Sequence, residues 1–185
     1  MPLGPYFYGV LSTPSIGAAT AADVPALAAL INRAYRGEAS RQGWTTEDHL
    51  LDGPRISEAA LRDMLRTPQA TLLTYLAAGS LTGCVYVHQQ GPQLYLGTLA
   101  VAPEAQAQGV GRQLLAAAEA YARQQGCSFI KITVLAARPE LLAWYERHGY
   151  GRTGAAEAFP DTTAFGRPRQ PLTLLELTKA VATGR

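Results

Sequence analysis

The sequence predicts a single α/β domain, in which a mixed, mostly antiparallel sheet of six or seven strands is flanked by about four helices. The chain has 185 residues, of which 48% are hydrophobic, so one buried core is enough. Three strand-like runs follow closely within residues 71–101, joined by short turn-forming segments, which indicates an antiparallel meander. Helical and strand-like patterns then alternate towards the C-terminal end.

In the first half, a short strand is expected around residues 15–19. A helix follows, capped by Thr20 or Asp23, because a proline fits its first turn and apolar residues recur at helical spacing. Residues 37–54 are polar and interrupted by glycine, so no regular element is expected there. Ser57 begins a second short helix. The strands of the meander are expected at 71–78, 81–89 and 93–101.

After the meander, an amphipathic helix is expected over residues 109–126, with Gly126 ending it. A β-branched run at 128–136 predicts a strand. Pro139 begins another helix, which Gly149 closes. Two final strands are expected at 151–158 and 172–179.

The chain is assigned to one domain of residues 15–185, preceded by residues 1–14 as an extension or an extra strand. Sixteen basic and fourteen acidic residues give a net charge of +2 without a run of like charges, which disfavours a nucleic-acid-binding protein. No signal peptide or membrane span is recognised, so a cytoplasmic protein without a membrane partner is expected. Cys84 and Cys127 are expected to be reduced core residues.

The segment LGTLAVAPEAQAQGVGRQLL, at 96–115, carries the strongest chemical signal. A strand leads into a loop with the spacing Gln106-x-x-Gly109-x-Gly111, and the glycines open a helix. Helix starts leave unpaired N–H groups, and glycines let those groups approach a diphosphate. Arg112 adds a positive charge.

The same loop is also compatible with a tight strand-to-helix connection without a ligand. A dinucleotide-binding fold is disfavoured, because Leu114 stands where the third glycine of its motif would fall and a meander precedes the loop. A P-loop is excluded, because no Gly-Lys-Ser/Thr sequence occurs.

The segment VAPEAQAQGVGRQLL resembles the cofactor motif of the GNAT superfamily of N-acetyltransferases. The segment WYERHGY at 144–150 is similar to the family's second motif, at the expected distance downstream. The resemblance covers roughly residues 15–180, and it implies the GNAT fold with acetyl-CoA as co-substrate and no metal. The segments AYRGEASRQGWTTEDHLLDG, ARPELLAWYERHGY and FGRPR also resemble a bacterial GNAT subgroup whose acceptor is unassigned.

The resemblance carries specific residues over to acetyl-CoA binding. The end of the 93–101 strand offers backbone groups to the pantetheine arm, and the loop after it holds the pyrophosphate. Arg138 stands where many members have Asn, and it is a candidate phosphate ligand. The implied cofactor residues are Leu99, Ala100, Val101, Gln106, Ala107, Gln108, Gly109, Val110, Gly111, Arg112 and Arg138.

Two residues are expected to act in the reaction. The Leu99 N–H, freed from the sheet ladder, would stabilise the oxygen that gains charge during acyl transfer. Tyr145 aligns with the tyrosine that protonates the leaving thiolate in many members, and its helical stripe points it inward. An ordinary core tyrosine is the alternative.

The general base and the acceptor site are less defined. The 93–101 strand has no carboxylate or histidine, so the candidate bases are Glu38, Glu47 and Asp48 of the polar loop, acting through water, and Glu47 is favoured. Trp44 in that loop is either a core anchor or one wall of the acceptor pocket.

Together, these observations predict transfer of an acetyl group from acetyl-CoA to a primary amine of a small molecule or a peptide. Assembly into a homodimer is compatible with the sequence. The alternative is an acyl-CoA-binding sensor or interaction module without turnover.

Overall fold

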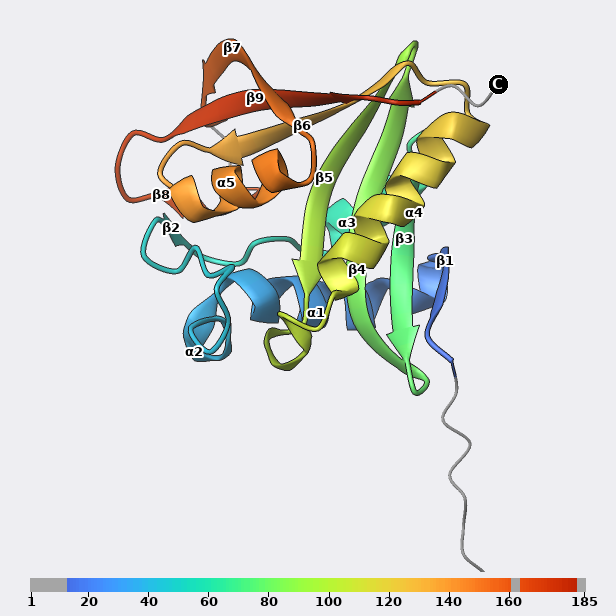
Figure 1. The fold of residues 1–185 in the computed structure, drawn as a ribbon. Helices are drawn as coiled ribbons and strands as arrows, with labels where there is room; N and C mark the ends of the chain where they lie inside the picture. Colours follow the sequence, from blue (N-terminus) through green and yellow to red (C-terminus); the bar gives the residue numbers. More distant parts are fainter. Residues whose placement is uncertain (1–12, 161–163, 183–185) are drawn as a thin grey trace, which may run out of the picture.

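The computed structural model of the protein describes residues 13–160 and 164–182 (Figure 1). The predicted extension at residues 1–14 therefore falls almost entirely outside the described residues.

The centre of the fold is a seven-stranded sheet in the order β1-β3-β4-β5-β6-β9-β7. All neighbouring strands are antiparallel except β5 and β6, which are parallel. This confirms the mixed, mostly antiparallel α/β fold. The strands are β1 (Ser15–Ala18), β3 (Ala70–Ala77), β4 (Ser80–Gln90), β5 (Gln93–Val101), β6 (Phe129–Leu135), β7 (Gly151–Ala158) and β9 (Thr173–Ala180).

The meander forms because its turns suit the twist of antiparallel strands. Ala78 and Gly79, between β3 and β4, both have positive φ angles, of 49° and 77°. Two consecutive residues of positive φ are typical of the type I′ turn that joins twisted hairpin strands. Gly91, with φ 62°, turns the chain between β4 and β5. The predicted meander is therefore present, within one or two residues of the expected bounds.

The helices cover both faces of the sheet. Helices α1 and α3 lie behind it and α4 lies in front, while α5 covers the half that contains β6, β9 and β7 (Figure 1). The α4 residues that face the strands are fully buried, Leu114 and Ala118 among them. The α-helices are α1 (Val24–Tyr35), α2 (Gly37–Ser40), α3 (Glu58–Arg66), α4 (Val110–Gln124) and α5 (Pro139–Arg147).

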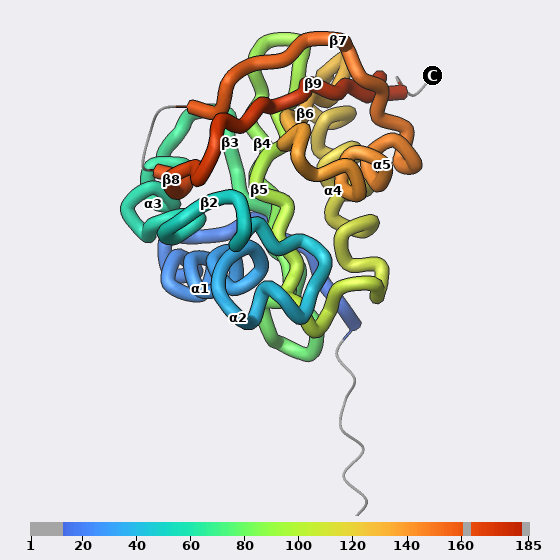
Figure 2. Tube along the Cα trace, turned by 90° about the vertical axis from the view of Figure 1, so that its left-hand side faces the viewer, coloured from blue at the N-terminus to red at the C-terminus, as the bar shows by residue number. Residues whose placement is uncertain are grey.

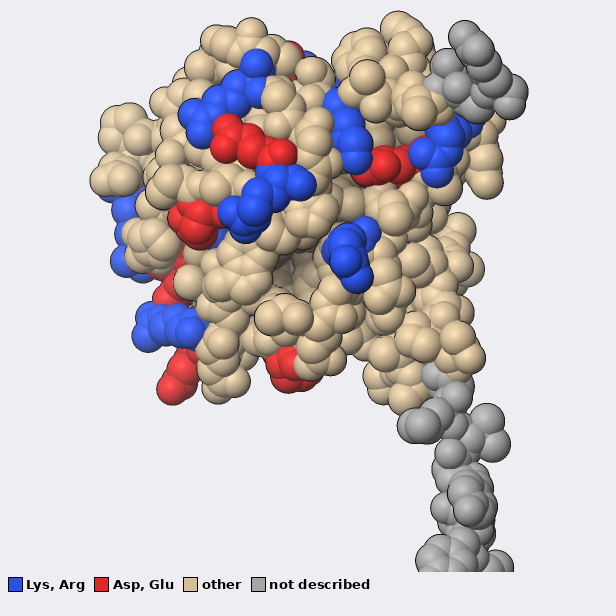
Figure 3. Space-filling model, viewed as in Figure 1, with Lys and Arg blue, Asp and Glu red and all other residues tan. Residues whose placement is uncertain are grey.

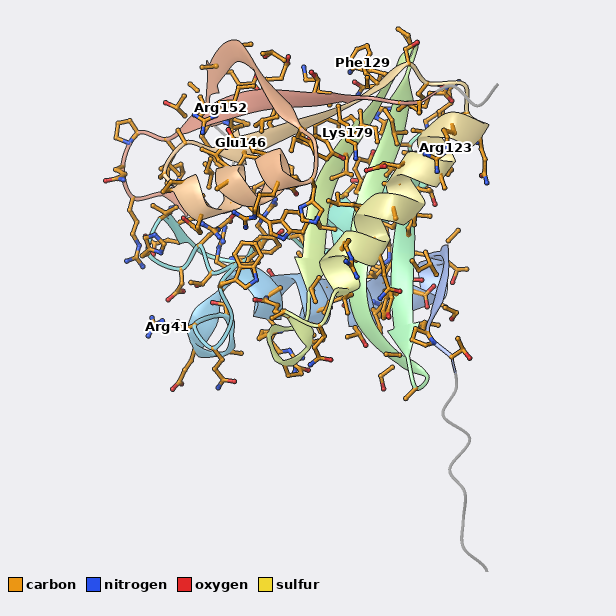
Figure 4. The ribbon with its side chains drawn as sticks, in the orientation of Figure 1. Arg41, Arg123, Phe129, Glu146, Arg152 and Lys179 are labelled. Carbon is orange, nitrogen blue, oxygen red and sulfur yellow. The ribbon has the colours of Figure 1, made fainter. Side chains whose placement is uncertain are left out.

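The two halves of the sheet separate at the parallel pair. Strands β5 and β6 pair only from Gln93 to Tyr95 on the β5 side, and beyond that point the halves fan apart (Figure 1). One ion pair links the second half to α4, and another lies within the second half. Lys179 of β9 reaches Glu119 of α4 at 2.6 Å, and Arg152 of β7 points to Glu146 of α5 at 2.7 Å (Figure 4).

The polar loop at 37–54 is more ordered than its sequence indicates. It contains the single-turn α2 and the short strand β2 (Leu51–Asp52), which pairs with β8 (Arg167–Pro168) although more than a hundred residues separate them (Figure 2). Arg36 stabilises this arrangement, because its guanidinium donates to the carbonyls of Gly53 and Phe165. These contacts are tertiary, and local sequence patterns do not reveal them.

Both cysteines are buried and free, as expected. Burial raises the pKa of the Cys84 thiol to about 12. In the described residues, no helix has the length and apolar character needed to cross a bilayer.

Candidate active site

The loop between the end of β5 and the start of α4 forms one side of the candidate site. After β5 the chain makes a 3₁₀ turn at Pro103–Ala105, and then Ala107 and Gly109 adopt positive φ angles of 62° and 84°. Gly109 caps α4 in the left-handed conformation, so the N–H groups of the first helical turn face outwards. Gly111 allows the start of α4 to pack closely against Trp144, because a Cβ at this position would lie 3.4 Å from the Trp144 ring.

Gln106 anchors this loop to the rest of the molecule. Its amide donates to the Thr45 hydroxyl at 2.9 Å and to the Val101 carbonyl at 3.1 Å. Its carbonyl oxygen accepts the backbone N–H of Trp44 at 2.9 Å. With all three contacts made to protein, the Gln106 side chain holds the loop in position.

Strand β5 carries a bulge next to the start of this loop. Register with β4 shifts between Gly97 and Ala100, so Thr98, with φ 47°, and Leu99 have no pairing residue on β4. The Leu99 carbonyl instead accepts the hydroxyl of Tyr35 from α1. Because β6 has already diverged, the open edge of β5 beyond Tyr95 is available to an extended ligand.

Tyr145 lies on the buried face of α5 and is 6% exposed. Its ring makes edge contacts with Trp144, at 4.9 Å between centroids, and with Tyr150, at 5.5 Å. Burial raises the pKa of Tyr145 well above its ordinary value, with further contributions from Tyr35 and Tyr150. The hydroxyl therefore stays protonated throughout the neutral pH range.

Two cavities meet at these residues. The first, of about 770 Å³, follows the start of α4, and the second, of about 570 Å³, lies beyond the β5 bulge against β6. Tyr35, Leu99, Leu141 and Tyr145 line both. Figure 3 shows the surface hollowed between α4 and α5, with Lys or Arg side chains on either side of the hollow.

The comparisons with known proteins agree with this geometry. Residues 28–150 match the family described as "Acetyltransferase (GNAT) family". The chain belongs to the GNAT acetyltransferase family. No curated protein sequence matches it.

Solved GNAT structures share the fold at low identity. The ribosomal-protein-S18-alanine N-acetyltransferase of Escherichia coli has a TM-score of 0.70 at 17% identity, covering 94% of this chain and 97% of its own. The ribosomal-protein-alanine N-acetyltransferase of Brucella melitensis has a TM-score of 0.67 at 22% identity, with coverages of 90% and 99%. An N-acetyltransferase of Staphylococcus aureus Mu50 has a TM-score of 0.66 at 15% identity, with coverages of 92% and 100%.

The predicted cofactor residues of this GNAT domain divide into two groups. Most line the first cavity, where unpaired amides, Arg112 and the open edge of β5 suit a long anionic cofactor such as acetyl-CoA. Ala100 and Val110 face the core, with 1% and 5% exposure. The members that line the cavity are Leu99, Val101, Gln106, Ala107, Gln108, Gly109, Gly111 and Arg112.

The structure does not bring Arg138 to either cavity. Its side chain is 2% exposed and donates to the carbonyls of Trp44 and Thr45, each at 3.1 Å, and it pairs with Glu140. Arg138 therefore fixes the 44–45 segment beside the first cavity.

Trp44 and Glu47 lie on different sides of the GNAT site. Trp44 is 38% exposed and lines the first cavity, with its ring 6.1 Å from that of Trp144. Glu47 lines the second cavity, and its carboxylate lies 2.8 Å from Arg36 and 3.7 Å from Arg55. Trp44 is thus a wall of the first cavity rather than a core anchor, and it does not line the second cavity.

Three residues of the site were not singled out from the sequence. Tyr35 ends the apolar stripe of α1, so it reads as core, and only the fold brings its hydroxyl to Leu99. Trp144 precedes Tyr145 in the second motif, and this adjacency was the available signal. Arg55 has no local signal, because it lies in an irregular segment.

Among the described residues, no cluster of three or more His, Cys, Asp or Glu side chains is arranged to hold a metal ion.

Proposed function

We propose that this GNAT domain is an acetyl-CoA-dependent N-acetyltransferase acting on a primary amine of a small molecule or a peptide. The observation that carries the proposal is the meeting of two cavities at Leu99 and Tyr145. One cavity has the features of a diphosphate site, and the other has room for an acceptor. A reaction between two bound molecules needs this arrangement.

Acetyl-CoA, when bound, supplies an acetyl group activated as a thioester. In the proposed complex, the amides at the start of α4 and Arg112 hold the pyrophosphate. The open edge of β5 at Leu99–Val101 pairs with the pantetheine arm as an additional strand would. Arg138 contributes indirectly, by fixing the Trp44–Thr45 segment.

The reacting groups follow from the same geometry. The Leu99 N–H lies in the bulge and is proposed to donate to the thioester oxygen as it gains negative charge. Tyr145 is proposed to give its proton to the departing sulfur, since its hydroxyl is protonated at neutral pH. Glu47, which lines the second cavity, is proposed to take the ammonium proton of the acceptor through water.

Two measurements test the proposal. Acetyl-CoA should raise the unfolding temperature, because it binds only the folded protein. Free CoA should then accumulate when a panel of primary amines is added, and mass spectrometry should detect the acetylated amine. Binding without CoA release from any amine would instead indicate a sensor or interaction module.

A further inference from the structure

The second cavity is larger than an amino group needs, and aromatic rings form part of its wall. It measures about 570 Å³, and its wall includes the rings of Tyr86, Tyr95, Phe159 and Phe165. Such a wall binds an acceptor with an apolar or aromatic body.

Arg55 is the unusual residue of that wall. Its guanidinium carbon lies over two aromatic rings, 5.3 Å from the centroid of Tyr35 and 5.2 Å from that of Phe165. The two rings fix the position of the guanidinium and leave its N–H edges for hydrogen bonding.

The N–H groups of the Arg55 guanidinium form few interactions within the protein. Among the described residues, Nη1 of Arg55 is buried without a hydrogen-bond partner. Its Nε lies 3.7 Å from Glu47, which is an ion-pair contact rather than a hydrogen bond. A buried unpaired N–H is costly, and Nη1 is out of reach of an atom of the size of water in this structure. A ligand oxygen therefore gains this hydrogen bond when the guanidinium turns towards the cavity.

The surrounding charges favour an anion at this position. Glu47 is shared between Arg36 and Arg55, so the three side chains carry one net positive charge. Arg36 is already engaged by the carbonyls of Tyr35, Gly53 and Phe165 in addition to Glu47.

On the far side of the cavity, Lys131 pairs with Glu176 at 2.6 Å and lies near Glu157. Glu176 and Glu157 bring two negative charges to the one positive charge of Lys131, so this side of the cavity is not positive. Among the described residues that line the cavity, the excess positive charge therefore lies at Arg55. One net charge suits a monoanion such as a carboxylate, which also matches the planar guanidinium fork.

We propose that the acceptor is an amine that also bears a carboxylate on an apolar or aromatic body, and that Arg55 binds this carboxylate. This inference rests on the proposed function, because the second cavity is then the acceptor site.

The test compares two amines that differ mainly in charge, phenylalanine and phenylalaninamide. The kcat/KM ratio of the acid over the amide is measured for the wild type, Arg55→Gln, Arg55→Lys and the control Arg62→Gln. Arg62 is exposed on α3 and pairs with Glu58. The two amines also differ in basicity, but this difference enters every variant's ratio equally, so comparing the ratios between variants cancels it.

We expect the wild type to prefer the acid and Arg55→Gln to lower the ratio about 10- to 100-fold, as the loss of a charged hydrogen-bonded pair would. Arg55→Lys should recover part of it, because the charge remains without the planar fork. Arg62→Gln should leave the ratio unchanged. A ratio in Arg55→Gln equal to that of the wild type overturns the inference and leaves the proposed function standing.

A binding measurement distinguishes failure of the carboxylate site from failure of the proposed function. Calorimetry with CoA present compares N-acetylphenylalanine with its amide on the wild type and Arg55→Gln. If no amine is turned over but the acid binds the wild type alone, the carboxylate site stands and the proposed function fails. Equal binding of acid and amide overturns the carboxylate site.

Discussion

Tyr145, at the junction of the two cavities, is the residue on which the proposed proton transfer depends. Tyr145→Phe removes one hydroxyl and keeps the ring contacts with Trp144 and Tyr150. We expect kcat to fall about 10- to 100-fold with little change in acetyl-CoA affinity, because the loss is that of a general acid. Steady-state kinetics and calorimetry measure the two quantities.

The matched control for this change is Tyr121→Phe. Tyr121 is a half-buried tyrosine of α4 that lines neither cavity. It should keep the wild-type kcat. If Tyr145→Phe is equally active, Tyr145 is an ordinary core residue.

Glu47 has a proposed role as a base and an ion-pair role with Arg36 and Arg55 that the structure shows. Glu47→Gln should lower kcat/KM about 10- to 100-fold at neutral pH, and the deficit should narrow as pH rises, because more of the amine is then already deprotonated. The unfolding temperature should also fall, since Arg36 and Arg55 lose their counter-ion.

The pH dependence distinguishes these roles. A deficit of the same size at every pH, together with the lower unfolding temperature, would leave Glu47 with the ion-pair role alone. Asp48→Asn is the control, because Asp48 pairs with Arg41 and lines neither cavity.

At the next level of organisation, the start of α4 is the element that binds the cofactor in our proposal. Gly109→Val places a branched side chain where the amides must approach a diphosphate. We expect acetyl-CoA affinity to be abolished while the fold survives, with a cost of about 1–2 kcal/mol for the left-handed backbone. Calorimetry and urea unfolding provide the two readouts.

Gly126, at the other end of α4, provides a control in which the substitution strains the backbone in a similar way. Gly126 also has positive φ, 69°, and a Cβ there would meet nothing within 4 Å. Gly126→Val should lose similar stability and retain acetyl-CoA binding. Retained affinity in Gly109→Val would mean that the loop holds no phosphate.

For the molecule as a whole, buried phenols link stability to alkaline pH. Burial raises the pKa of Tyr35, Tyr145 and Tyr150 in the folded protein, whereas the unfolded chain has phenols with a pKa of about 10. Above that value the folded state binds more protons than the unfolded state. The contribution of these three phenols to the free energy of unfolding should therefore be constant below about pH 10 and fall as pH rises further.

Urea unfolding at a series of alkaline pH values measures this dependence. Tyr150→Phe removes one of the three phenols and should make the decline shallower. A free energy of unfolding that stays constant well above pH 10 would mean that these phenols ionise equally readily in both states.

The order of the main elements could be predicted from the sequence because each follows from local physics. Ser57 caps α3 by accepting the N–H of Ala60, and glycines with positive φ end α4 and α5 at Gly126 and Gly149. The loop before α4 was likewise recognised, since glycine spacing at a helix start is a local feature.

The features missed from the sequence depend on residues far apart in the chain. The pairing of β2 with β8 joins residues 51–52 to 167–168, and neither segment has a strand-like pattern. Arg138 looked like a phosphate ligand from its position in the motif. In the fold its donors reach Trp44 and Thr45, more than ninety residues away.

The family, the sheet and the cofactor loop were thus readable in the chain alone, because capping, turn chemistry and hydrophobic period act over a few residues. The second cavity could not be predicted from these local features. Its wall gathers Tyr35, Glu47, Arg55 and Phe165 around the β5 bulge. Only long-range packing decides which of these polar groups are hydrogen-bonded inside the protein and which, like Nη1 of Arg55, have no hydrogen-bond partner among the described residues.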